Sequence, residues 1–159
     1  MPVFISHRKA DTATAVRANS RLKQYGIPTY LDVLDLALQS PENVTQKILA
    51  GLQPCTHLLA IISAETAGSW WVPFEIGVAT NADKRITSFS IATARANLPD
   101  YLLVWPVLTR DEQIEMFAMR YLKDRKTLEK SYRLEEAQRT PIQSAADFHR
   151  LLKRDLGQE

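Results

Sequence analysis

Short hydrophobic runs alternate with longer amphipathic stretches up to about residue 108. Polar residues bound each run, a pattern typical of strands that are buried on both faces of a parallel sheet. The runs predict five strands, at residues 3–6, 27–31, 57–63, 86–91 and 102–108. Helix-length segments separate most of them, so we expect an α/β fold in which right-handed crossovers place helices on both faces of the sheet.

The segments between the runs carry the signals of helix ends. Asp11 stands at an N-cap position and Gly26 at a C-terminal stop, with hydrophobic residues at helical spacing between them. Ser40 and Pro41 form a cap and first-turn pair for a second helix, and residues 70–82 predict a third. Each of these helices therefore joins one predicted strand to the next.

The chain beyond the last strand is far more charged. Residues 110–159 contain eleven basic and ten acidic residues and almost no strand pattern. Two hydrophobic stripes predict helices there, the second opening with a capping-box-like start at Ser144. The stripes consist of Ile114, Phe117 and Tyr121, and of Phe148, Leu151, Leu152 and Leu156. We expect a core domain at 1–109 and a helical extension at 110–159 packed on it as a solvated cover or, alternatively, as a partner-binding surface.

Composition narrows the class of protein. The 159 residues are 45% hydrophobic and 24% charged, which fits one globular domain, and a net charge of +2 gives no support for nucleic-acid binding. No apolar run approaches the length of a membrane span, and no signal-peptide pattern is present. The lone Cys55 lies among apolar residues and is interpreted as a small buried hydrophobe rather than a reactive thiol. We expect a soluble cytoplasmic protein that binds neither membrane nor nucleic acid.

Ligands of open parallel sheets bind outside the carboxyl ends of the strands, where the strand order reverses. Residues 6–11 follow the first strand and residues 63–75 the third, and a flavodoxin-like order 2-1-3-4-5 places both beside one crevice. Trp71 and Glu75 are four residues apart and project from one helix face, so they can share a pocket. A packed tryptophan and a surface glutamate are the alternative.

Four segments in this order resemble a TIR domain. They are Val3-Phe-Ile-Ser-His7, Gly26-Ile-Pro-Thr-Tyr-Leu-Asp32, Leu58-Leu-Ala-Ile-Ile-Ser63 and Ser69-Trp-Trp-Val-Pro-Phe-Glu75. The resemblance covers residues 2–91 and implies the flavodoxin-like TIR fold, with a central five-stranded parallel sheet. Leu98-Pro-Asp-Tyr-Leu102 and the charged tail are similar to those of stand-alone bacterial TIR proteins, including the Thoeris antiphage type. The loop after Asp32 departs from the family in lacking a glycine.

The resemblance implies an NAD glycohydrolase or cyclase in which NAD is a substrate and no cofactor is needed. Glu75 is then the catalytic carboxylate, which stabilises the positive charge that forms on the ribose as nicotinamide leaves. The residues expected to bind substrate are Ser6, His7, Arg8, Lys9, Asp32 and Trp71. Arg8 and Lys9 suit the diphosphate and Trp71 the nicotinamide riboside. Their alternatives are solvated surface charges and a core tryptophan, while His7 can be structural and Asp32 can cap its loop.

Other functions find less support in the residues. His7, His57 and His149 are scattered and lack metal-ligand spacing, so no metal is expected. The expected product is ADP-ribose or a cyclic isomer, the latter a second messenger for a separate effector protein in antiphage defence. The first alternative is a non-catalytic TIR scaffold that acts through protein contacts and self-assembly. The second is an enzyme like nucleoside deoxyribosyltransferase, which also uses a glutamate at a glycosidic bond.

Overall fold

The computed structural model describes residues 1–31, 41–64, 66, 71–90, 98–135 and 144–158. Its strands form one parallel sheet in the order β2-β1-β3-β4-β5, as predicted for a flavodoxin-like fold. The strands are β1 (Val3–Ser6), β2 (Thr29–Leu31), β3 (His57–Ile61), β4 (Arg85–Phe89) and β5 (Val107–Leu108). The helices are α1 (Thr12–Gln24), α2 (Pro41–Leu52), α3 (Trp71–Asn81), α4 (Gln113–Glu135) and α5 (Ala145–Asp155), with short 3-10 helices η1 (Lys9–Asp11) and η5 (Asp100–Val104).

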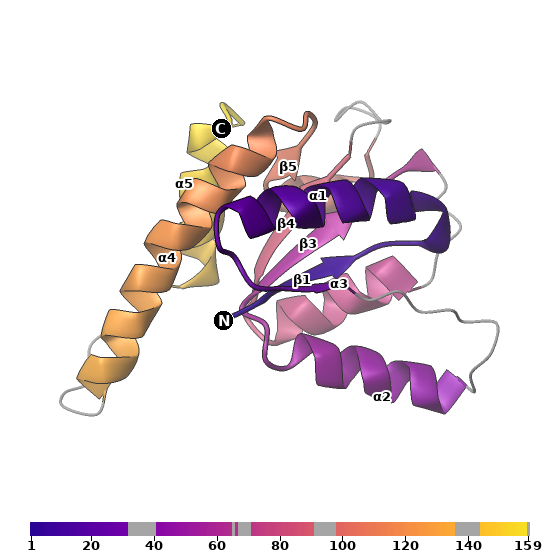
Figure 1. Cartoon of the computed structure of the whole chain (residues 1–159), viewed down its shortest axis with the longest axis horizontal. Helices are drawn as coiled ribbons and strands as arrows, with labels where there is room; N and C mark the ends of the chain where they lie inside the picture. Colours follow the sequence, from indigo (N-terminus) through magenta and orange to yellow (C-terminus); the bar gives the residue numbers. More distant parts are fainter. Residues whose placement is uncertain (32–40, 65, 67–70, 91–97, 136–143, 159) are drawn as a thin grey trace.

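Helices cover both faces of the sheet (Figure 1). Successive strand residues point to opposite faces, so each strand supplies two packed clusters. Val3 and Ile5 of β1 pack with α1, α4 and α5, whereas Phe4 packs with α2 and α3. The continuous hydrophobic runs in the sequence thus reflect strands that are buried on both sides, as expected.

The last predicted strand is largely wrong. Residues 100–104 form η5, and only Val107 and Leu108 of the expected run pair with β4. Pro99 precedes the 3-10 helix and Pro106 lacks the N–H group that a ladder requires. Tyr101 and Val104 are exposed while Leu102 is buried, which suits one helical turn lying on the core better than a strand buried on both faces.

The C-terminal helices pack on the sheet through the predicted stripes. Ile114, Phe117 and Tyr121 of α4 are fully buried, as is Phe148 of α5. Ser144 caps α5 by accepting a hydrogen bond from the backbone N–H of Asp147 at 3.3 Å, as its position predicted. The division of the chain at residue 109 stays a prediction.

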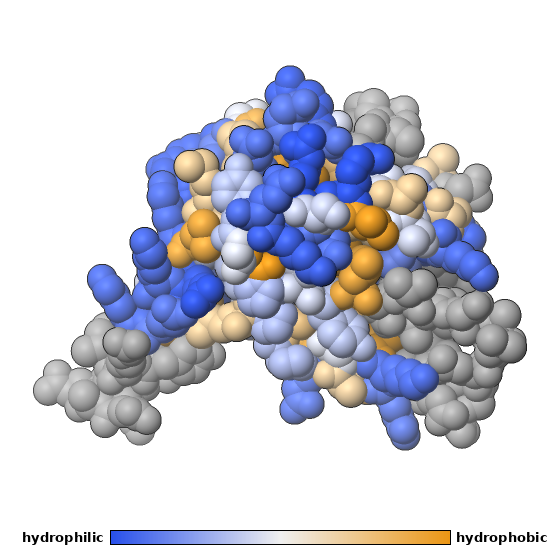
Figure 2. Space-filling view, viewed as in Figure 1, coloured by the Kyte–Doolittle hydropathy of each residue, from blue (hydrophilic) through white to orange (hydrophobic). Residues whose placement is uncertain are grey.

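The outer surface over α1 and α4 is mostly hydrophilic, with hydrophobic side chains scattered across it (Figure 2). The exposed hydrophobic residues of these two helices include Val16 and Met119. Within the described ranges, no helix combines the length and the apolar character needed to cross a membrane.

Candidate active site

The strand order reverses between β1 and β3, and their carboxyl ends therefore border the crevice where ligands of this architecture bind. Ser6 ends β1, and η1 follows it at Lys9–Asp11. Ile61 ends β3, and Ser63 and Thr66 lie just beyond. The two segments expected to carry the chemistry thus leave the sheet at adjacent positions, as the sequence predicted.

A hydrogen-bonded bridge spans this point of reversal. The Ser63 hydroxyl donates to Asp11 Oδ2 at 2.9 Å, and the backbone N–H of Ser63 donates to Thr66 Oγ1 at 2.9 Å. Asp11 stands at the predicted N-cap position of α1, but its side chain makes no capping bond. We name Asp11, Ser63 and Thr66 the crevice bridge. It fixes the loop after β1 against the loop after β3.

Sequence reasoning did not find the crevice bridge. Its members were visible only as polar residues that follow two strands, and Asp11 also fitted a capping role. A hydrogen bond between residues 52 positions apart depends on the strand order, which single residues do not display. The placement of both segments at one sheet edge was the only available signal.

Glu75 lies in the second turn of α3 and is only 4% exposed. Val72, Ile76 and Ala79 of the same helix are buried against the sheet. A surface glutamate, the alternative considered above, is therefore excluded. Carboxylates are seldom buried unless other groups stabilise their charge, so a buried Glu75 at the start of α3 is a candidate for chemistry.

Ser6 and His7 lie at the end of β1. Ser6 is fully buried, and neither its Oγ nor His7 Nδ1 has a hydrogen-bond partner. Burial lowers the pKa of His7 against the opposing effect of a backbone hydrogen bond and the Asp11 carboxylate. A neutral imidazole at neutral pH can accept a hydrogen bond from a ligand as well as donate one.

The other expected site residues are described unevenly. Arg8 precedes η1 and is half-buried, while Lys9 is exposed at its start. Both residues lie on the loop after β1, which borders the crevice where the strand order reverses. Trp71 begins α3, but its side chain lies outside what the structure describes, and Asp32 lies outside the described residues altogether.

This arrangement suits a substrate that carries negative charge and develops positive charge during reaction. Arg8 and Lys9 lie on the loop after β1, and the buried carboxylate of Glu75 lies on α3, the helix after the neighbouring strand β3. Electrostatic interactions strengthen where water is excluded, so a carboxylate in this setting can stabilise a cation that develops beside it. In the described part of the chain, no group of three or more His, Cys, Asp or Glu side chains is placed to hold a metal ion.

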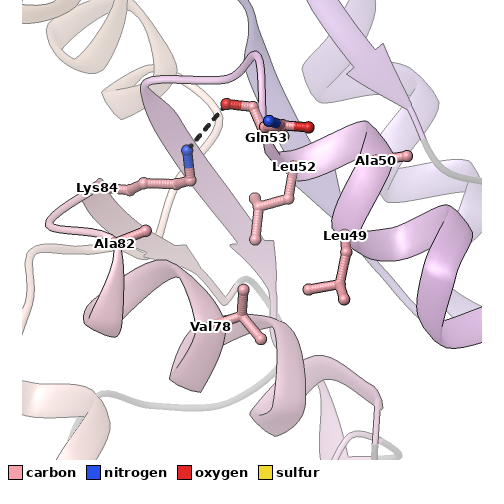
Figure 3. A pocket seen from close by; sticks show the side chains of 7 residues that line it. All are labelled: Leu49, Ala50, Leu52, Gln53, Val78, Ala82 and Lys84. Carbon is pink, nitrogen blue, oxygen red and sulfur yellow. Dashed lines mark hydrogen bonds between the residues drawn. The ribbon is translucent and has the colours of Figure 1, made fainter.

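A pocket of about 490 Å³ lies elsewhere, between the ends of α2 and α3 (Figure 3). Leu49, Leu52 and Val78 make its lining largely apolar. Lys84 at its rim donates hydrogen bonds to the carbonyl oxygens of Gln53 at 3.4 Å and Cys55 at 2.5 Å, which caps the end of α2. The pocket lies at the amino ends of the strands, whereas Glu75 lies toward their carboxyl ends.

Cys55 behaves as its sequence context predicted. It is 2% exposed, its Sγ donates to the carbonyl oxygen of Gly51 at 3.2 Å, and burial raises its pKa to about 11. The thiolate needed for reactivity is therefore scarce at neutral pH.

The family model described as TIR domain matches residues 3–131. The match covers the whole sheet and most of α4. No curated protein matches the chain significantly.

Proposed function

The chain belongs to the TIR domain family, and we propose that it cleaves NAD between nicotinamide and ribose, with Glu75 as the catalytic carboxylate. The observation that supports this most is the burial of Glu75 at 4% exposure, on the helix that follows the crevice strand β3. TIR domains include NAD-cleaving enzymes, which gives this carboxylate a matching reaction.

The proposed reaction breaks the bond between ribose C1′ and the nicotinamide nitrogen. The bonding electrons leave with nicotinamide, which departs as a neutral molecule and needs no strong acid. Positive charge remains on the ribose, and the Glu75 carboxylate stabilises it as carboxylates do in glycosidases. Water then attacks C1′ and loses a proton to give ADP-ribose, or a nucleophilic group of the same molecule attacks C1′ to give a cyclic ADP-ribose isomer.

The residues around the crevice suit the remaining parts of NAD. Arg8 and Lys9 are proposed to bind the diphosphate, because cationic donors and backbone N–H groups after a strand commonly receive phosphate. Trp71 is proposed to wall the nicotinamide riboside, and Ser6, His7 and Asp32 to contact the substrate. The crevice bridge holds the Arg8 and Lys9 loop in place.

We further propose the stand-alone bacterial, Thoeris-like setting for this activity. In that setting a cyclic product acts as a second messenger for a separate effector protein in antiphage defence, in the cytoplasm. Self-assembly of TIR domains is proposed as a way to complete or activate the site.

The test compares Glu75→Gln with Glu115→Gln, a matched control on the exposed surface of α4. Each protein is incubated with NAD, and the products are separated and identified by mass spectrometry. Removing a preorganised electrostatic group typically lowers a rate about 100-fold to 1,000-fold, so Glu75→Gln is expected to lose turnover to that extent while Glu115→Gln keeps it.

The outcomes separate the two classes of function. Equal turnover by wild type and Glu75→Gln would remove Glu75 from the mechanism. No turnover by wild type at any protein concentration, together with partner binding that survives Glu75→Gln, would establish a scaffold instead. The mass of the product distinguishes ADP-ribose from a cyclic ADP-ribose isomer, which is lighter by one water.

A further inference from the structure

β5 is an edge strand of the sheet, with β4 on its inner side. The backbone N–H groups of Ser88 and Ser90 in β4 donate to the carbonyl oxygens of Pro106 and Leu108. Successive residues of a strand direct their backbone groups to opposite sides, so the N–H and C=O groups of Val107 point away from β4. Outward groups of this kind can pair with a strand of another chain.

The side chain of Gln158 occupies the outer side of β5. Its Oε1 accepts the backbone N–H of Val107 at 3.0 Å, and its Nε2 donates to the carbonyl oxygen of the same residue. The amide thus meets both outward groups of Val107, as a residue of a neighbouring strand would. A carboxylate in its place could only accept and an ammonium could only donate, so the side-chain amide suits this position.

The end of α5 directs Gln158 to β5. Gly157 has a φ of +66°, in the left-handed region that favours glycine. Its N–H donates to the carbonyl oxygen of Arg154 at 3.1 Å, and the N–H of Gln158 donates to that of Lys153 at 3.0 Å. These two hydrogen bonds form a Schellman motif, which ends the helix and turns the chain. The position of Gln158 is therefore set by the backbone before it.

Two further side chains of α5 bond to backbone groups on this side of the sheet. Lys153 Nζ donates to the carbonyl oxygen of Leu103 at 2.7 Å, and His149 Nε2 accepts the N–H of Ile86 at 2.7 Å. Ile86 lies two residues before Ser88, which pairs with the first residue of β5, so its N–H lies beyond the amino end of that strand. α5 thus covers backbone groups that the short β5 leaves without a strand partner.

We propose that the outer side of β5 is an interaction surface for a second copy of this chain, and that Gln158 blocks it. A second copy carries the same edge, and two β5 strands related by a two-fold axis can pair antiparallel. Tyr101 and Val104, in the 3-10 helix directly before β5, are 48% and 64% exposed and provide apolar surface for the same contact. α5 lies beyond residues 3–131, so the block is built from outside the family match. The proposal does not depend on NAD cleavage.

The test compares Gln158→Ala with Gln24→Ala, the same substitution at an exposed glutamine that ends α1. Gln158 belongs to neither core cluster, so its truncation should leave the fold intact. Hydrogen exchange of the Val107 amide is followed by NMR in dilute protein. It should be about fivefold to tenfold faster in Gln158→Ala, because the acceptor of this N–H is lost, and unchanged in Gln24→Ala.

Protein concentration then distinguishes an open edge from one that a second copy occupies. Over a roughly hundredfold rise in concentration, protection of the Val107 amide should return in Gln158→Ala, together with a dimer mass by light scattering. Wild type and Gln24→Ala should show the same Val107 exchange at all concentrations. Association through a different surface would change the mass of all three proteins alike, so the Val107 amide is the deciding measurement.

Three outcomes would overturn the proposal. Equal Val107 exchange in wild type and Gln158→Ala would show that Gln158 does not protect the edge. Faster exchange that stays the same at every concentration would exclude pairing with a second copy. A dimer of Gln158→Ala in which the Val107 amide remains unprotected would place the contact elsewhere on the molecule.

Discussion

The two edges of the sheet both bury polar side chains, but the kinds of polar group differ. At the amino edge, Arg85 donates to Asp124 Oδ2 at 3.0 Å, and His57 Nε2 lies 3.5 Å from the same oxygen. Toward the carboxyl edge, the hydroxyls of Ser6 and Ser88 are buried without partners. An ion pair lies at the amino edge, but unpaired buried polar atoms lie at both, since His57 Nε2 and Asp124 Oδ1 also lack a hydrogen-bond partner.

We interpret the amino edge as a structural region and the carboxyl edge as the candidate active site. The amino-edge cluster of His57, Arg85 and Asp124 joins α4 to β3 and β4. The His57 ring packs 4.7 Å from the Tyr121 ring and 4.8 Å from the Phe148 ring, so it also contacts α5.

The largest effect is expected from breaking the amino-edge cluster. Asp124→Asn should lower the free energy of unfolding by about 3–5 kcal/mol, because it removes the carboxylate that pairs with the buried Arg85 guanidinium. Urea unfolding followed by circular dichroism measures the loss. NAD turnover well below the unfolding midpoint should stay close to that of wild type, since the cluster lies at the edge opposite Glu75.

The control for this variant is Glu129→Gln on the same helix. Glu129 pairs with Arg125 at 2.6 Å, but both side chains are more than a third exposed, so the change should cost at most about 1 kcal/mol. Replacing both Arg85 and Asp124 with apolar residues should recover much of the lost stability. Similar losses for Asp124→Asn and Glu129→Gln would show that the amino edge is no more structural than the surface.

A smaller effect is expected from opening the crevice bridge. Ser63→Ala removes the donor to Asp11 Oδ2 and should lower the free energy of unfolding by about 1 kcal/mol. It should raise the KM for NAD several-fold, because the loop that carries Arg8 is no longer held against β3. Ser20→Ala, on the exposed face of α1, is the matched control and should change neither. A stability loss without a change in KM would make the bridge a structural feature like the amino edge.

Most element positions could be predicted because hydrophobic runs and cap residues act locally, whereas the strand order was predicted from the flavodoxin-like architecture. The exception at residues 102–108 has a local cause too, since Pro99 precedes and Pro106 interrupts a run that hydrophobicity alone favoured. The stripes of α4 and α5 were readable as hydrophobic faces. What they pack against was not readable, because the His57 and Asp124 contact joins residues far apart in the sequence.

The candidate site divides in the same way. Glu75 could be selected from its spacing to Trp71 and its family resemblance, but its burial depends on how α3 lies on the sheet.

The smallest effect at neutral pH is expected from His149→Gln. This variant tests whether the neutral form of His149 stabilises the amino edge. Burial, reinforced by the Arg85 cation, lowers the pKa of His149 from 6.5 to about 4, and its Nε2 accepts the backbone N–H of Ile86 at 2.7 Å. The unfolded chain therefore takes up a proton as pH falls below 6.5 while the folded chain stays neutral until about 4. The stability that the neutral His149 contributes is therefore fully present above pH 6.5 and is lost as the pH falls from 6.5 to about 4.

Glutamine keeps an acceptor but does not titrate. The free energy of unfolding of His149→Gln should therefore stay within about 0.5 kcal/mol of the wild-type value at pH 7. It should fall less steeply than that of wild type as the pH is lowered. Burial also lowers the pKa of His57, so part of the acid-dependent loss should remain in the variant. Urea midpoints measured at several pH values between 7 and 4.5 provide the comparison. If stability falls equally steeply with pH in the two proteins, His149 takes up its proton over the same pH range in the folded and the unfolded chain. That result would contradict the hydrogen bond in which its Nε2 accepts from Ile86.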